Sequence, residues 1–307
     1  MAADLLSIMT EVVCVLDCQD KLGEGIFWCP EEQVLYWVDI AMPSILHRFD
    51  PASGRHKTWA MPEMISSLAK RRDGTLFVAS HHGLNFFDPI SETLTRVVAP
   101  EASRPLNRAN DGAPDAHGRF WYGSMTNNIA ADGSDLPIPS ATGVLYRVEP
   151  DMRVIPMDGP VGISNGTCFS PDSSTLYFAD TMAEAIYAYD LDLESGGIRN
   201  KRIFANPSGY GYPDGSTVDA EGYIWNARWE AACLIRFSPD GEIDRVVEIP
   251  ASRVTCCAFG GKNLDELYVT TSRMNVSPSE LELHPEAGGV FALSPGVCGL
   301  PRPMFGG

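Results

Sequence analysis

The chain has 307 residues, 44% hydrophobic and 21% charged, a composition of a folded protein rather than a disordered or collagen-like one. Lys and Arg number 23 and Asp and Glu 40, so the formal net charge is −17, which argues against nucleic acid or an anionic membrane as partner. No apolar run approaches the roughly 18 residues of a membrane-spanning helix. The start, Met1 to Glu11, carries Asp4 and no basic segment, unlike a signal peptide. Eight cysteines without a CxxC pair favour reduced thiols in the cytoplasm.

A short apolar strand that follows a polar turn recurs six times along the chain. The six segments are 35–40, 76–80, 120–125, 176–180, 224–228 and 267–271. Their first residues are 41, 44, 56, 48 and 43 positions apart, and turn residues such as Asp-Gly precede several of them. A further strand follows most repeats, as at 144–150, 185–191 and 233–239. This period predicts an all-β, six-bladed β-propeller of four-stranded antiparallel blades, a single domain over residues 1–307. We expect residues 11–17 to lie beside 288–294 and to close the ring.

Polar residues occupy one position of the repeat, 10 or 11 places before the repeated strand. Four units carry an oxygen-bearing side chain there: Glu24, Asn110, Asn165 and Asp214. The other two units carry Ile65 or Ser66, and Thr255 or Cys256. Because the first strand of each blade lines the central channel, we expect the four polar side chains to meet at one mouth of it.

Carboxylate and amide oxygens at this mouth are hard ligands suited to a divalent cation, whose sphere water and a substrate would complete. Two alternatives stay open: turn residues with no further role, or polar side chains that fill the channel without a metal. Arg108 lies two residues before Asn110 and should reach the same mouth. There it could bind substrate hydroxyls or a carboxylate, or form a surface salt bridge.

Several motifs in order resemble the regucalcin/gluconolactonase (senescence marker protein) family. They are LGEGIFW with LYWVDI, RANDG with GRFWYGSM, ISNGTCFSPD with LYFAD, and YPDGSTVDAEG, within a likeness that runs from about residue 11 to about 295. The resemblance implies a six-bladed propeller with one metal in the channel, held by Glu24, Asn165 and Asp214. It also implies substrate contacts from Arg108 and Asn110.

One position departs from the pattern of some family members, which carry an acidic residue three places after the GTM-like segment. Asn128 stands there in this chain, so we expect its contacts with sugar hydroxyls to differ. The polar loop from Asn127 to Ser140 is expected to help form a lid over the site.

The hypothesis is a metal-dependent sugar lactonase that opens an aldonolactone, of the glucono-, xylono-, arabinono- or galactonolactone type, to the aldonic acid. Asp214 is the candidate general base, and Arg108, Asn110 and Asn128 would orient the sugar. The cation could be Ca²⁺, Zn²⁺, Mg²⁺, Mn²⁺ or Fe²⁺. Alternatives are a calcium-binding protein without turnover, a propeller that binds proteins, or a hydrolase of another ester or lactone. The sequence names neither the sugar nor the metal and leaves the oligomeric state open.

Overall fold

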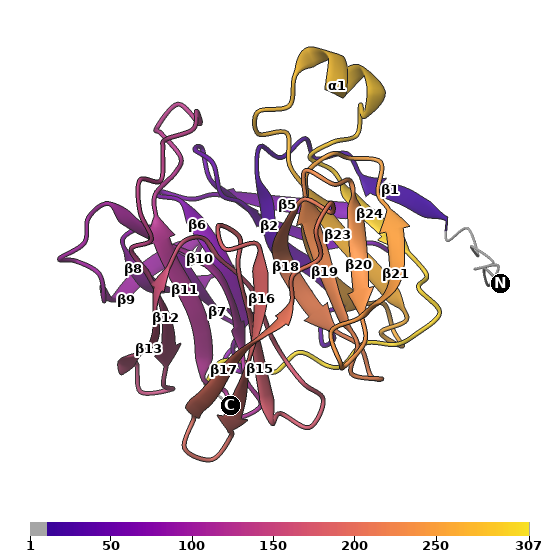
Figure 1. Cartoon of the computed structure of the whole chain (residues 1–307). Helices are drawn as coiled ribbons and strands as arrows, with labels where there is room; N and C mark the ends of the chain where they lie inside the picture. The colour runs from indigo at the N-terminus through magenta and orange to yellow at the C-terminus, as the bar shows by residue number, and fades with distance from the viewer. Residues whose placement is uncertain (1–10, 307) are drawn as a thin grey trace.

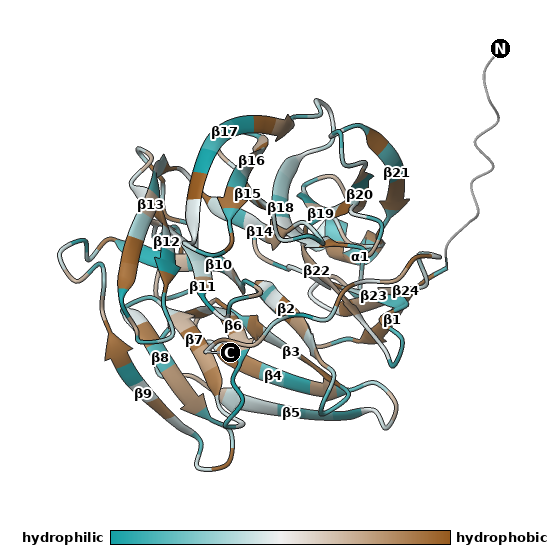
Figure 2. Ribbon diagram, turned by 90° about the horizontal axis from the view of Figure 1, so that it is seen from below, coloured by the Kyte–Doolittle hydropathy of each residue, from teal (hydrophilic) through white to brown (hydrophobic). Residues whose placement is uncertain are grey.

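The computed structural model describes residues 11–306, and within them the fold is a six-bladed β-propeller. Six four-stranded antiparallel sheets surround a central axis, with β2, β6, β10, β14, β18 and β22 innermost (Figure 2). Helix α1 (Pro278–Leu283) projects from one face of the ring (Figure 1). The blade number and the strand order expected from the repeat are confirmed.

Five blades are built from consecutive strands. They are β2(Gly23–Cys29), β3(Val34–Asp39), β4(Ile45–Asp50) and β5(Arg55–Ala60); β6(Ile65–Lys70), β7(Leu76–Ser80), β8(Gly83–Asp88) and β9(Thr93–Val98); β10(Asn107–Pro114), β11(Phe120–Thr126), β12(Gly143–Val148) and β13(Val154–Val161); β14(Ser164–Phe169), β15(Thr175–Asp180), β16(Ala185–Asp192) and β17(Gly197–Ala205); β18(Tyr212–Val218), β19(Ile224–Trp229), β20(Cys233–Phe237) and β21(Ile243–Glu248). The six repeated apolar segments are the second strands of the blades.

The sixth blade joins the two ends of the described chain. It contains β22 (Val254–Gly260), β23 (Glu266–Thr271) and β24 (Val290–Leu293), and its outermost strand is β1 (Val12–Leu16). β1 pairs antiparallel with β24, with Val12 opposite Leu293. The ring is therefore closed by main-chain hydrogen bonds between distant segments, at the place expected from the sequence.

The core lies between the faces of neighbouring blades. Every residue of β3 and of β7 is buried, whereas outer strands such as β5 are mostly exposed, which explains why the second strands read as continuous apolar runs. Three second strands, β3, β11 and β19, each bury a tryptophan whose indole N–H donates to an aspartate, as a buried indole requires. The pairs are Trp37 with Asp20 at 2.8 Å, Trp121 with Asp115 at 2.8 Å, and Trp225 with Asp219 at 3.0 Å.

A β-bulge interrupts the inner strands at the level of the polar repeat position. In β2 the register shifts between Glu24 and Phe27, and in β14 between Asn165 and Cys168. Gly25 adopts φ +61°, and a Cβ there would lie 2.8 Å from the carbonyl oxygen of Ser66 in the next blade. A bulge turns a side chain away from the sheet face, and here it directs polar groups toward the channel.

Candidate active site

The four polar repeat positions converge at one mouth of the channel. Glu24, Asn110, Asn165 and Asp214 come from β2, β10, β14 and β18, and each is only 4–6% exposed. The amide of Asn110 donates to the side-chain oxygen of Asn165 at 3.0 Å and to the carbonyl of Ser164 at 2.8 Å. Glu24 and Asp214 lie close enough for each to influence the pKa of the other. Side chains separated by up to 190 positions in sequence therefore form one cluster.

Arg108 and Asn128 contact this cluster through hydrogen bonds. The Arg108 guanidinium is 3% exposed and donates to the side-chain oxygens of Asn110 at 2.5 Å and Asn128 at 2.9 Å. It also donates to the carbonyl of Ala109 at 3.0 Å, while its Nε–H has no partner. The guanidinium thus holds two candidate substrate-binding amides in fixed orientations.

Burial controls the ionisation of the cluster. Removal from water raises the pKa of Glu24 to about 8, with a further contribution from the charge of Asp111. Burial and then the neighbouring Glu24 raise the pKa of Asp214 well above its usual value. Burial lowers the pKa of Arg108 to about 10, against the charges of Glu24 and Asp214. Two carboxylates that repel each other in a dry site are costly unless a proton or a cation compensates them.

The residues fit a divalent cation. Asp214 Oδ1 is buried and has no hydrogen-bond partner, which leaves one acceptor beside Glu24 without compensation. The amide oxygen of Asn165 keeps a second lone pair besides the one that Asn110 uses. Among the described residues, no cluster of three or more His, Cys, Asp or Glu suits a metal. The candidate donor set is instead two carboxylates and one amide, all hard oxygen ligands.

Residues that the sequence analysis missed orient this set. The amide of Asn165 donates to the hydroxyl of Thr181 at 2.8 Å, and that hydroxyl donates to the carbonyl of Pro213 at 2.8 Å. Asn226, fully buried in β19, donates to the main-chain oxygen of Asp214 at 2.8 Å. The available signal for the last of these was a polar Asn at a position where the other repeated strands carry an apolar or aromatic residue.

The loop 127–140 contacts residues from other blades of the ring. Ile129 is 1% exposed and belongs to the hydrophobic cluster that includes Leu22 and Met274 of the facing blades. The amide of Asn275, shortly before α1, donates to the carboxylate of Asp135. The loop therefore spans from the blade that carries Asn110 to the blades on the other side of the channel.

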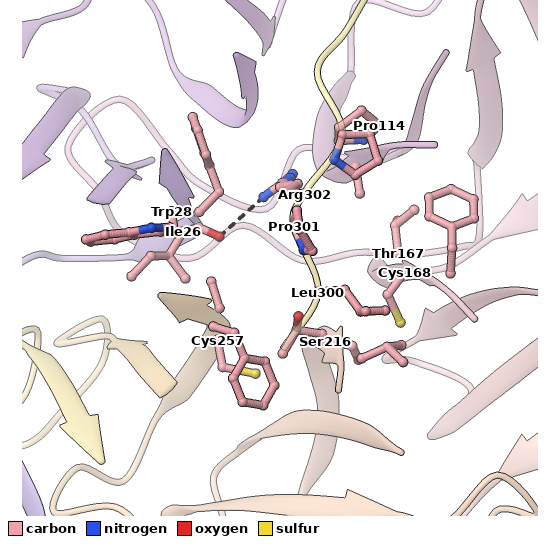
Figure 3. Close-up of a pocket in the computed structure, with 18 of the residues that line it drawn as sticks. Ile26, Trp28, Pro114, Thr167, Cys168, Ser216, Cys257, Leu300, Pro301 and Arg302 are labelled. Atoms are coloured by element: carbon pink, nitrogen blue, oxygen red, sulfur yellow. Dashed lines mark hydrogen bonds between the residues drawn. The ribbon is translucent and has the colours of Figure 1, made fainter. Parts of the chain in front are cut away.

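The opposite end of the channel holds a second feature that the sequence analysis did not predict. A cavity of about 330 Å³ lies beneath the site, with Trp28, Thr167, Cys257 and residues 300–303 of the C-terminal tail along its wall (Figure 3). The Arg302 guanidinium donates to the carbonyls of Ile26 at 3.4 Å, Leu68 at 3.2 Å and Gly112 at 3.1 Å. These come from the inner strands β2, β6 and β10 of three blades. The tail therefore crosses the far mouth and links three blades there by hydrogen bonds. Burial raises the pKa of Asp111, and the positive charge of Arg302 opposes this shift because it favours the ionised carboxylate.

The structure also bears on the cysteines and on possible membrane-spanning helices. All eight cysteines are free thiols, five of them buried. Within residues 11–306 there is no helix with the length and apolar character needed to cross a bilayer. The prediction that the chain has no signal peptide concerns mainly residues outside the described part.

Comparison with known proteins gives consistent results. Residues 22–273 match the family described as "SMP-30/Gluconolactonase/LRE-like region". The chain is 36% identical to 6-deoxy-6-sulfogluconolactonase of Pseudomonas putida, over 96% of this chain and 98% of that protein. It is also 36% identical to L-arabinolactonase of Azospirillum brasilense, over 97% and 96% respectively.

Solved structures of similar fold are also known. The fold superposes on a calcium-binding protein, regucalcin, from Agrobacterium tumefaciens with a TM-score of 0.89 and 32% identity, over 96% of this chain and 97% of that one. The six-bladed architecture, the position of the polar cluster and the match over most of the chain lead to one conclusion. This protein belongs to the SMP-30/gluconolactonase/LRE-like family.

Proposed function

We propose that this protein is a lactonase that hydrolyses an aldonolactone to the open aldonic acid. The observation that carries the proposal is the buried pair Glu24 and Asp214, with one unpartnered Asp214 oxygen, beside the donors of Arg108 and Asn110. Carboxylates near hydrogen-bond donors suit attack of water on a polar ester. Relatives that are 36% identical over nearly the whole chain are named lactonases, which supports the same reaction class.

Glu24, Asn165 and Asp214 would hold one divalent cation, whose chemical role when bound is to polarise the lactone carbonyl as a Lewis acid. The uncompensated oxygen of Asp214 and the mutual repulsion of the two carboxylates support this assignment. Ca²⁺, Mg²⁺, Mn²⁺, Fe²⁺ and Zn²⁺ all accept such ligands. A calcium-binding regucalcin among the similar structures is consistent with it.

Residues of the chain would accept the proton, bind the sugar and exclude water. Asp214 would accept a proton from the attacking water, since its carboxylate lies in the site where that water would be held. Arg108, Asn110 and Asn128 would bind the sugar hydroxyls. Ile129 and the loop 127–140 would exclude bulk water while the reaction proceeds. The free thiols fit a reducing cytoplasm.

The test follows acid release from glucono-, xylono-, arabinono- and galactonolactone above the spontaneous rate. Chelated protein is measured first, and each divalent cation is then added back. We expect metal-dependent turnover of one or two of these lactones. Asp214→Asn should lose about 100-fold or more of kcat, the usual contribution of a general base. Asp240→Asn, which removes a charge from an exposed turn, is the matched control and should behave as wild type.

Two outcomes would contradict the proposal. Cation binding without hydrolysis of any lactone would indicate a calcium-binding protein without turnover. Wild-type activity in Asp214→Asn would remove both roles assigned to that carboxylate.

A further inference from the structure

Arg108 differs from most buried arginines of the described chain in having no carboxylate partner. Arg119 pairs with Asp115 at 2.7 Å, and Arg236 contacts three carboxylates. All three acceptors of Arg108 are neutral: one main-chain carbonyl and the amide oxygens of Asn110 and Asn128. Among residues 11–306, no carboxylate oxygen lies within 4.0 Å of its nitrogens. A buried guanidinium without a direct counter-ion is costly, and a ligand could supply the missing charge.

A second fully buried arginine shows what sets Arg108 apart. Arg228 also lacks a carboxylate partner, but it donates from Nε, Nη1 and Nη2 to Tyr210, Asn226 and Gly211. Each of its three nitrogens therefore has an acceptor. Arg108 instead keeps its Nε–H without a partner. It combines a charge that no carboxylate contacts directly with an unused Nε–H donor, at the mouth where substrate is proposed to bind.

The side-chain amide of Asn128 adds further N–H donors beside Arg108. Its side-chain oxygen is occupied by Arg108 at 2.9 Å, so the amide Nδ2 is the free end of the group. Asn128 is half-buried, and within the described part of the chain Nδ2 donates to no protein acceptor. An amide N–H favours an acceptor or an anion, whereas a carboxylate at this place would repel an anion and neutralise Arg108.

The charges at the site also favour an anionic ligand once a cation is bound. The carboxylates nearest to Arg108 are Glu24 and Asp214, which contribute to its environment electrostatically. A divalent cation would compensate both of them, and Arg302 counters the charge of the third buried carboxylate, Asp111. The charge of Arg108 would then remain. The surface of the protein is strongly acidic, but at physiological salt charges more than about 8 Å apart are largely screened. Inside the site, the positive charge of Arg108 therefore has more influence than the distant surface carboxylates on whether an anionic or a neutral ligand is preferred.

We propose that the preferred substrate is a sugar lactone with a second, negatively charged group on its carbon chain, a carboxylate or a phosphate. Arg108 and Asn128 are the residues that select it. This inference rests on the proposed lactonase function and names the substrate class for the same site.

The experiment compares lactones that differ in this charge. The kcat/KM values of D-glucono-1,5-lactone, D-glucaro-1,4-lactone and 6-phosphogluconolactone are measured with the cation that activates the enzyme. We expect at least one anionic lactone to exceed the neutral lactone by about tenfold to 100-fold, the value of one charge-assisted hydrogen bond. The two anionic compounds distinguish a carboxylate from a phosphate. Equal or higher kcat/KM for the neutral lactone would overturn this inference and leave the lactonase function intact.

A binding measurement without turnover tests the preference for an anionic ligand independently of the lactonase function. Calorimetric titration of the cation-loaded protein with glucarate and with gluconate should show at least about tenfold tighter binding of the dianion. Equal affinity would overturn the inference even if no lactone were hydrolysed.

The matched variants are Asn128→Asp and Asn263→Asp. The first places a carboxylate beside Arg108 and keeps an oxygen acceptor for it, so the preference for anionic over neutral ligands should fall about tenfold or more. The second adds the same charge at an exposed turn and should leave the preference unchanged. An unchanged preference in Asn128→Asp would refute the role of this residue.

Discussion

Replacement of Arg302 by methionine tests whether the C-terminal tail holds the inner strands together. The guanidinium supplies the donors for three main-chain carbonyls, on Ile26, Leu68 and Gly112. Each carbonyl lies two residues after the channel-lining position of its strand, which is Glu24 in β2 and Asn110 in β10. One side chain therefore contacts three blades at the same level, directly beneath the site.

The expected loss follows from these bonds. They are 3.1–3.4 Å long, toward the weak end of the range, so each contributes about 1 kcal/mol. Arg302→Met should lower the free energy of unfolding by about 3 kcal/mol. With an unfolding entropy of about 2 cal/mol/K per residue, this corresponds to a melting temperature about 5 °C lower.

Thermal and urea unfolding of the chelated protein measure this effect. Arg302→Lys should show a smaller loss, because an ammonium can keep some of the three contacts. Arg72→Met is the control: it makes the same replacement at an exposed residue of the turn after β6. An Arg302→Met protein that melts within about 1 °C of wild type would refute the reasoning.

Three further predictions concern the site and its surroundings. Burial raises the pKa of Glu24 to about 8, and metal ligands must be deprotonated, so Ca²⁺ binding should release protons and tighten between about pH 6 and 8. A calorimetric affinity that does not change with pH would contradict the ligand assignment. Burial also raises the pKa of Asp20 to about 7 from 3.8, so the metal-free protein should lose stability as pH rises through this window. Asp20→Asn keeps an acceptor for Trp37 and should flatten that decline in urea unfolding; an unaltered pH profile would show that Asp20 ionises normally. Ile129→Ala should weaken docking of the loop 127–140 by about 2–4 kcal/mol and speed its hydrogen exchange, whereas unchanged exchange would show that Ile129 does not anchor the loop.

The sequence alone determined the architecture because a propeller repeats one local pattern. The buried second strands are mostly apolar, and an Asp-Gly or Asp-x-x-Gly turn precedes three of them, so spacing and composition were enough to count six blades. The same spacing selected Glu24, Asn110, Asn165 and Asp214, since the inner strands bulge at one repeat position and direct those side chains toward the channel. Helix α1 was not predicted: its six residues carry no apolar stripe, and a capping box at Ser277 and Glu280 begins it.

Only the tertiary structure decided what surrounds these side chains. Arg302 meets Gly112 across 190 positions of sequence, and Asn110 meets Asn165 across 55. Such contacts depend on how blades are arranged around the axis, and no local periodicity encodes them. The same holds for charge: the composition shows an acidic protein, but the packing places Arg108, whose direct acceptors are all neutral, at the mouth of the channel. Burial, which exists only in the folded chain, raises the pKa of Glu24 and of Asp214 above the values of ordinary acids, and this supports the proposed cation site.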